Sequence, residues 1–127
     1  MKHCITGLIL LVSGQVMAAA APAEAYPSCN LQAQRNVAGT TGGEITDVRE
    51  AHISVRVNVL QADTGSARKA RLLTQAQADR LWRDATQVRS DARQLVRQQG
   101  FLSAAERASY DRALDELARQ LCSKLRN

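Results

Sequence analysis

The side chains that could perform covalent chemistry in this sequence are few, and they do not form a recognisable catalytic group. His52 is the only histidine after residue 20, and the acidic residues are scattered over expected helix surfaces. No nucleophile motif, zinc-binding motif or glycine-rich phosphate loop accompanies them, and their spacing does not suit a metal ion. We therefore expect no catalytic residue, no cofactor and no metal site. His52 is expected to be a half-buried packing residue in a protein that is not an enzyme.

Two cysteines have a clearer role. Cys29 and Cys122 lie near the two ends of the chain that follows residue 20, and no CxxC spacing indicates a metal site or a redox dithiol. An even pair of cysteines in an oxidising compartment normally forms a disulfide. We therefore predict a long-range Cys29–Cys122 disulfide. Cys4 precedes the first apolar run, where the cysteine of a lipid-anchoring motif cannot lie, so we expect no lipid anchor.

A row of arginines is the most distinctive surface feature that the sequence predicts. Arg89, Arg93 and Arg97 recur every four residues, with Trp82 on the same flank, so one helix face carries all four side chains. None of the three arginines has an acidic residue three or four positions away. We call Arg89, Arg93 and Arg97 the arginine stripe.

Two interpretations of the arginine stripe remain open. In the first, an acidic partner supplies the missing counter-charge, and the stripe with Trp82 is a binding site. In the second, the arginine stems cover Trp82, or another helix of this chain supplies the counter-charge. The acids that could do so include Glu106, Asp115 and Glu116.

The first twenty residues predict where the protein works. Lys2 is followed by an apolar run at residues 5–12 and by three alanines at residues 18–20. This is the arrangement of a secretory signal peptide, and the run is too short to span a bilayer. We expect residues 1–20 to be removed. The mature protein should then begin near Ala21, in the periplasm or outside the cell, without stable insertion into a membrane.

The net charge is positive and unevenly distributed. The sequence has 17 Lys and Arg residues against 12 Asp and Glu residues, and residues 68–97 hold 8 of the cations and 3 of the acids. This balance favours a partner with an acidic surface. We expect that partner to be a protein, because an exported chain does not meet nucleic acid.

The rest of the chain divides into an arm and a helical domain. Residues 21–43 contain two prolines and a Thr-Thr-Gly-Gly cluster without sustained periodicity, which predicts an irregular N-terminal arm. Residues 44–127 form the predicted helical domain, although residues 44–65 are ambiguous. Alternating apolar residues at 53–59 fit a strand, whereas Asp47 can cap a helix and Gly65 can end it. We favour the helix, whose stripe at helical spacing comprises Ile45, Val48, His52, Val55, Val59 and Ala62.

A repeated start pattern predicts two further helices. Leu73-Thr74-x-x-Gln77 and Leu102-Ser103-x-x-Glu106 each place an apolar residue before a capping box, so helices should begin near residues 74 and 103, with Gly100 between them. Apolar residues at steps of three and four support both helices. The first stripe is Ala78, Leu81, Ala85, Val88, Ala92 and Leu95, and the second is Tyr110, Leu114, Leu117, Leu121 and Leu125. The predicted fold is a small all-α domain of three helices with an irregular N-terminal arm and one long-range disulfide.

The first of these start patterns also resembles a known family. Leu73-Thr74-x-x-Gln77 is similar to the LTxxQ motif of the Spy and CpxP family of small exported helical proteins, and Leu102-Ser103-x-x-Glu106 is a degenerate copy. The resemblance implies an ATP-independent chaperone or an envelope-stress or metal sensor. It covers at most a fifth of the mature chain, and the cysteine pair is not part of the family's pattern.

Three functional hypotheses follow. The leading one is a non-enzymatic exported helical protein that binds another macromolecule in the periplasm through Trp82 and the arginine stripe. The second is a chaperone or envelope-stress protein like those of the Spy and CpxP family. The third is an immunity or inhibitor protein against an envelope-acting hydrolase. The sequence does not choose among them, and it leaves the oligomeric state open.

Overall fold

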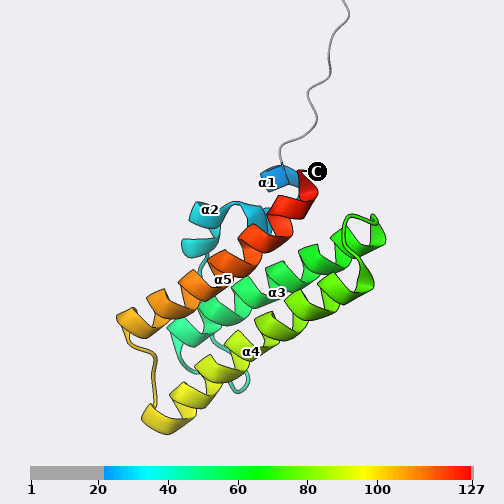
Figure 1. Ribbon diagram of the computed structural model, residues 1–127. Coiled ribbons are helices and arrows are strands. Elements are labelled where there is room, and N and C mark those ends of the chain that lie inside the picture. Colours follow the sequence, from blue (N-terminus) through cyan, green and yellow to red (C-terminus); the bar gives the residue numbers. More distant parts are fainter. Residues whose placement is uncertain (1–21, 127) are drawn as a thin grey trace, which may run out of the picture.

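A computed structural model describes residues 22–126 (Figure 1). The predicted signal peptide, residues 1–20, lies outside the described residues. Three long helices form a bundle, and shorter helical turns precede them in the chain. In order, the elements are α1 (Pro22–Ala25), the 3-10 helix η1 (Pro27–Cys29), α2 (Leu31–Arg35), α3 (Val48–Lys69), α4 (Gln75–Gln99) and α5 (Ala104–Leu125). The predicted all-α class with three principal helices is confirmed.

The ambiguous segment, residues 44–65, forms most of helix α3. Asp47 caps its N-terminus, because the Asp47 side chain accepts a hydrogen bond of 2.8 Å from the backbone N–H of Glu50. The helix does not end at Gly65, as the sequence suggested it could, but continues to Lys69. Gly65 therefore lies inside the helix.

The buried face of α3 differs from the stripe of residues 45–62 drawn from the sequence. Ile53, Val57 and Leu60 are almost completely buried, whereas Val48 is 61% exposed. The reason is that α3 is the central helix: it contacts α4, α5 and η1, and so it is covered on more than one side. Apolar spacing alone could not locate this wide buried face, because it also contains polar residues.

Helices α4 and α5 begin as predicted, and α4 ends at the predicted break. The Thr74 and Ser103 side chains each accept a hydrogen bond from the backbone N–H of the third residue of the helix, and the Gln77 and Glu106 side chains each accept one from the N-cap backbone N–H. Gly100 ends α4 with a φ of 90°, a conformation that glycine adopts without the steric penalty of a Cβ. Both predicted capping boxes are confirmed.

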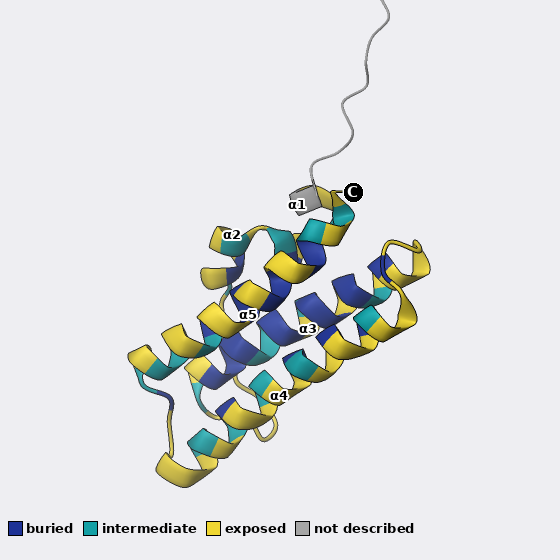
Figure 2. Ribbon diagram, viewed as in Figure 1, coloured by how far each residue is buried: buried dark blue, intermediate teal, exposed yellow. Residues whose placement is uncertain are grey.

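The hydrophobic core lies between the three long helices (Figure 2). Leucines and alanines dominate it, as the scarcity of aromatic residues requires. The predicted apolar stripes of α4 and α5 face this core. Their buried members include Ala78, Leu81, Ala85, Leu114 and Leu121. No helix among the described residues is both long and apolar enough to cross a membrane.

The N-terminal arm is fastened to the bundle at its start by the predicted disulfide. Cys29 and Cys122 are bonded, with their Cα atoms 5.9 Å apart, so η1 is held on the last turns of α5. The arm is not wholly irregular, because α1, η1 and α2 are short helical turns within it. Figure 1 shows these turns beside α5 rather than α4.

Farther along the arm, the backbone at Gly39 lies directly on α3. A Cβ atom at Gly39 would be 2.2 Å from the backbone N of His52 and 2.6 Å from the backbone O of Val48. Both distances are well inside van der Waals contact, and both involve main-chain atoms that cannot move aside. Only glycine fits at this crossing.

Candidate binding surface and buried charge network

The structure divides the arginine stripe into two engaged side chains and one exposed side chain. Arg89 donates hydrogen bonds to the side chains of Asn58 and Gln61 on α3. Arg93 pairs with Glu50, which also lies on α3, at 3.5 Å between Nε and a carboxylate oxygen. Two of the three arginines therefore face groups of this chain. The counter-charge for Arg93 is Glu50, which is not among the acids that the sequence analysis named.

Arg97 and Trp82, the other members of the predicted site, do not lie together. Arg97 is exposed near the C-terminus of α4, where it lines a hollow with Arg93 and Glu50. Trp82 is 50% exposed and lies toward the other end of α4, in a hollow shared with Arg68 and Thr64 of α3. The four residues of the predicted site are thus not brought together on one free surface.

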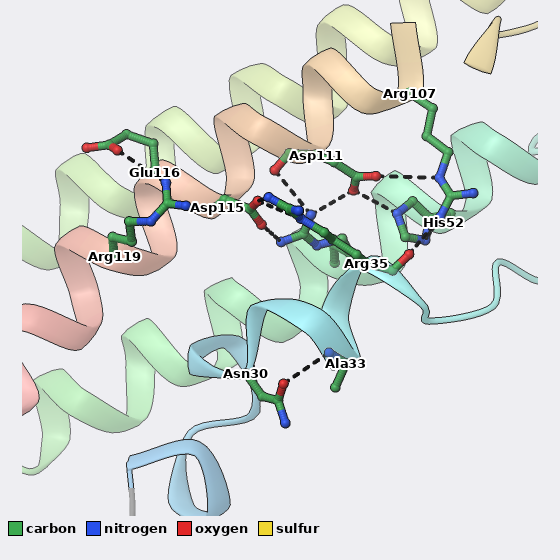
Figure 3. Close-up of polar contacts among 10 residues, drawn as sticks. Asn30, Ala33, Arg35, His52, Arg107, Asp111, Asp115, Glu116 and Arg119 are labelled. Carbon is green, nitrogen blue, oxygen red and sulfur yellow. Dashed lines mark hydrogen bonds and ion pairs between the residues drawn. The ribbon is translucent and has the colours of Figure 1, made fainter. Parts of the chain in front are cut away.

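A buried network of charged residues joins α3 to α5 (Figure 3). Arg56 of α3 donates to Asp111 and to Asp115 of α5, each at 2.7 Å, and the Arg56 and Asp115 side chains are 2% and 0% exposed. Arg107 of α5 also approaches Asp111, at 3.5 Å. Charges buried to this degree are tolerated only when they are paired and hydrogen-bonded. Arg56 meets both conditions through its two terminal guanidinium nitrogens, while its Nε has no hydrogen-bond partner among the described residues.

His52 belongs to the same network. Its Nε2 lies 2.8 Å from an Asp111 carboxylate oxygen, and its Nδ1 lies 2.7 Å from the backbone carbonyl oxygen of Val37. The side chain is 2% exposed, so it is fully buried rather than half-buried as expected from the sequence. Burial raises the pKa of Asp111, but hydrogen bonds from His52 and Arg56 lower it more, and the net pKa lies below its ordinary value.

The network also holds the N-terminal arm. Arg35 of α2 donates from its guanidinium to Asp115, and Arg107 donates to the backbone carbonyl of Arg35 at 2.8 Å. The bond from His52 to Val37 adds a third polar contact between the arm and the bundle. We call Arg35, His52, Arg56, Arg107, Asp111 and Asp115 the charge clasp.

The charge clasp holds the arm, α3 and α5 together. Both ring nitrogens of His52 face groups of this chain, and its ring is buried. Among the described residues, no group of three or more His, Cys, Asp or Glu side chains is arranged to hold a metal ion.

A second group of cations lies exposed at one end of the bundle. Its members come from α3, α4, α5 and the loop between α3 and α4, and we call them the basic end: Arg68, Lys69, Arg71, Arg80 and Lys124. Arg80 and Lys124 line one hollow, of about 230 Å³, between α4 and α5. Within residues 22–126, none of the five side chains forms an ion pair or a hydrogen bond.

The nearby acidic residues do not neutralise the basic end. Asp63 is buried and accepts a hydrogen bond of 2.8 Å from the backbone N–H of Ser28. Asp79 is exposed, lines the hollow that contains Arg68, and accepts a hydrogen bond of 2.7 Å from the neutral Gln75 side chain, so it keeps its negative charge. Five exposed cations against one exposed carboxylate leave the basic end with an excess of positive charge.

The loop at the basic end contains a backbone conformation that is unusual for its residue. Arg71 has a φ of 62°, in the left-handed region. The N–H groups of Arg71 and Leu72 close the end of α3 by bonding the carbonyls of Arg68 and Ala67, which is the Schellman arrangement. Glycine normally occupies this position, and an L-residue there costs roughly 1–2 kcal/mol.

The sequence contained a partial indication of these sites. The excess of cations in residues 68–97 is visible in the sequence, but the regular spacing of the arginine stripe does not predict the cluster at the end of the bundle. The charge clasp joins residues from 35 to 115, and only the fold brings them together. Comparison with known proteins adds no relative: no protein-family model, curated protein or solved structure matches this chain.

Proposed function

We propose that this chain is an exported, non-enzymatic helical protein that binds an acidic surface of the cell envelope through its basic end. The observation that carries the proposal is the set of five exposed cations at that end. Internal acids engage Arg35, Arg56, Arg93 and Arg107. By contrast, the cations of the basic end face solvent, where an external anion can approach them.

The proposed location rests on two features. The pattern of residues 1–20 is that of a signal peptide, and the Cys29–Cys122 disulfide suits a compartment that oxidises thiols. Together they favour the periplasm over the cytoplasm. Intact-mass measurement of the exported protein should show an N-terminus near Ala21 and no free thiol. A retained leader, or two cysteines open to alkylation, would contradict this part.

Co-sedimentation with washed cell envelopes tests the binding. The variant Arg68→Gln/Lys69→Gln/Arg71→Gln should lose most of its envelope binding at low salt, because exposed charges act over about 8–10 Å at moderate ionic strength. The matched control is Arg97→Gln/Arg112→Gln/Arg119→Gln, which removes the same charge from exposed positions elsewhere on α4 and α5. The control should bind like the wild type. An equal or greater loss in the control would place the site away from the basic end.

A chaperone function is the second candidate, favoured by one observation. Leu72 is 38% exposed among the cations of the basic end, and a surface that is both basic and apolar suits unfolded clients. Such a protein would suppress the aggregation of several unrelated clients at near-stoichiometric ratios, and Leu72→Gln would weaken that effect. Recovery of one tight protein partner from envelopes, without any effect on aggregation, would instead favour the inhibitor hypothesis.

A further inference from the structure

We propose that the acidic surface recognised by the basic end is that of a lipid bilayer containing anionic phospholipid. The bundle would contact the bilayer through the loop between α3 and α4. This inference rests on the proposed function and names its partner. It concerns adsorption to the surface of the bilayer, in keeping with the absence of a spanning helix among the described residues.

The shape of the basic end favours a flat partner. The loop between α3 and α4 projects at one end of the bundle, and it is almost entirely exposed (Figures 1 and 2). Arg68, Lys69 and Arg71 lie in or beside this loop, while Arg80 and Lys124 flank it from α4 and α5. Cations that come from several elements at one end of the bundle can contact several headgroup phosphates of a bilayer at once.

The apolar residue at the loop points to the same partner. Leu72 is 38% exposed and directly follows the cations Arg68, Lys69 and Arg71. At a bilayer surface, an apolar side chain beside cations can enter the boundary between headgroups and acyl chains. An acidic protein would need a matching apolar pocket to accept the same residue, whereas a bilayer needs none.

The strained conformation of Arg71 is an independent observation at the same place. Glycine would relieve the strain of a φ of 62°, yet the loop carries an arginine. Strained backbone is found preferentially at functional positions. The left-handed turn places a cation at the point where the chain reverses between α3 and α4, next to Leu72.

The test uses protein-free vesicles, so that lipid is the only partner available. Protein recovered from the periplasm, with its mass checked, is sedimented with vesicles of phosphatidylcholine alone or of phosphatidylcholine mixed with phosphatidylglycerol. We expect binding to the mixed vesicles at low salt, little binding to phosphatidylcholine alone, and release at high salt. Since each Lys or Arg near an anionic surface contributes about a factor of five, Arg68→Gln/Lys69→Gln/Arg71→Gln should weaken partitioning by roughly 100-fold.

Two further variants separate the alternatives. Arg97→Gln/Arg112→Gln/Arg119→Gln removes the same net charge away from the loop and should change partitioning by less than about threefold. Arg71→Gly removes one cation while relieving the strained turn, so it should fold at least as well as the wild type and bind about fivefold more weakly. An equal loss in the two triple variants would show a response to net charge alone and would overturn the inference.

The vesicle and envelope experiments can fail separately. If the protein binds washed envelopes through the basic end but does not bind phosphatidylglycerol vesicles, the partner is an acidic protein or another envelope polymer. The lipid inference is then wrong while the proposed function stands. If neither envelopes nor vesicles are bound, the proposed function is wrong as well.

Discussion

At the scale of single residues, Asp111 is the junction of the charge clasp. One of its carboxylate oxygens lies within 2.8 Å of both His52 and Arg56, and the other lies 3.5 Å from Arg107. Each of these three side chains also contacts the arm or Asp115. Loss of the Asp111 charge would therefore leave several buried donors without their acceptor, which is more costly than loss of one exposed pair.

Asp111→Asn should lower the free energy of unfolding by about 3–5 kcal/mol at neutral pH. Urea unfolding followed by circular dichroism measures the change. The matched control is Glu116→Gln on the same helix, because Glu116 and Arg119 form an exposed pair at 3.7 Å that should contribute less than about 1 kcal/mol. Similar losses in the two variants would contradict a special role for the clasp.

The pH dependence of the Asp111 contribution has a defined sign. The pKa of Asp111 in the folded protein lies below the ordinary 3.8. An acid whose pKa is lower in the folded protein than in the unfolded chain stabilises the fold fully above the pKa of the unfolded chain. This contribution is lost as the pH falls through the pKa of the folded protein. The difference in stability between the wild type and Asp111→Asn should therefore shrink as the pH falls below about 4. A difference that grew toward low pH would refute this account.

At the scale of elements, α4 uses part of its arginine stripe to pack on α3. Arg93 reaches Glu50, whose side chain is 7% exposed. Burial of an unpaired carboxylate is costly, so this pair helps to fix α4 against the start of α3. Arg97, one turn later on α4, is exposed and makes no ion pair within the described residues.

Arg93→Gln should therefore lower the free energy of unfolding by about 1–2 kcal/mol, a value below that of a fully buried pair because Arg93 is partly exposed. Arg97→Gln should change it by less than about 0.5 kcal/mol. Denaturant titration of both variants measures the two effects. If Arg93→Gln were neutral or stabilising, repulsion within the stripe would outweigh the contact with Glu50.

The elements differ in how far sequence predicts them. The starts of α4 and α5 were predictable because the Thr74 and Ser103 capping boxes are local patterns, complete within four residues. The end and the buried face of α3 were not, because Arg71 replaces the expected glycine and because the interior next to His52 is polar. A capping box can be predicted from a short stretch of sequence, because its hydrogen bonds join neighbouring residues. A buried charge network cannot, because it depends on which helices pack together.

At the scale of the whole molecule, the arm and bundle are joined mainly by covalent and polar contacts. The disulfide and the Ser28–Asp63 hydrogen bond hold the start of the arm, and the charge clasp holds the middle of the arm. Tyr26 and Leu31 are only partly buried against the core. The attachment of the arm therefore depends on oxidation and on charge more than on apolar packing.

Reduction of the Cys29–Cys122 disulfide should lower the free energy of unfolding by roughly 4–5 kcal/mol, since the bridge spans 93 positions. For a domain of this size, the melting temperature should fall by at least about 15 °C. Calorimetry of the oxidised and reduced protein measures the shift, and Cys29→Ser/Cys122→Ser should melt like the reduced protein. A shift of only a degree or two would mean that the bridge adds little stability.

The position of this cross-link along the chain also imposes an order on biosynthesis. Cys29 precedes all three long helices, whereas Cys122 lies in the last turn of α5. A chain that crosses a membrane from its N-terminus therefore exposes one thiol to the oxidising side long before the other arrives. If residues 1–20, which contain Cys4, are removed as we propose, two cysteines and a single pairing remain. Maturation of such a chain requires an oxidant but no disulfide isomerase.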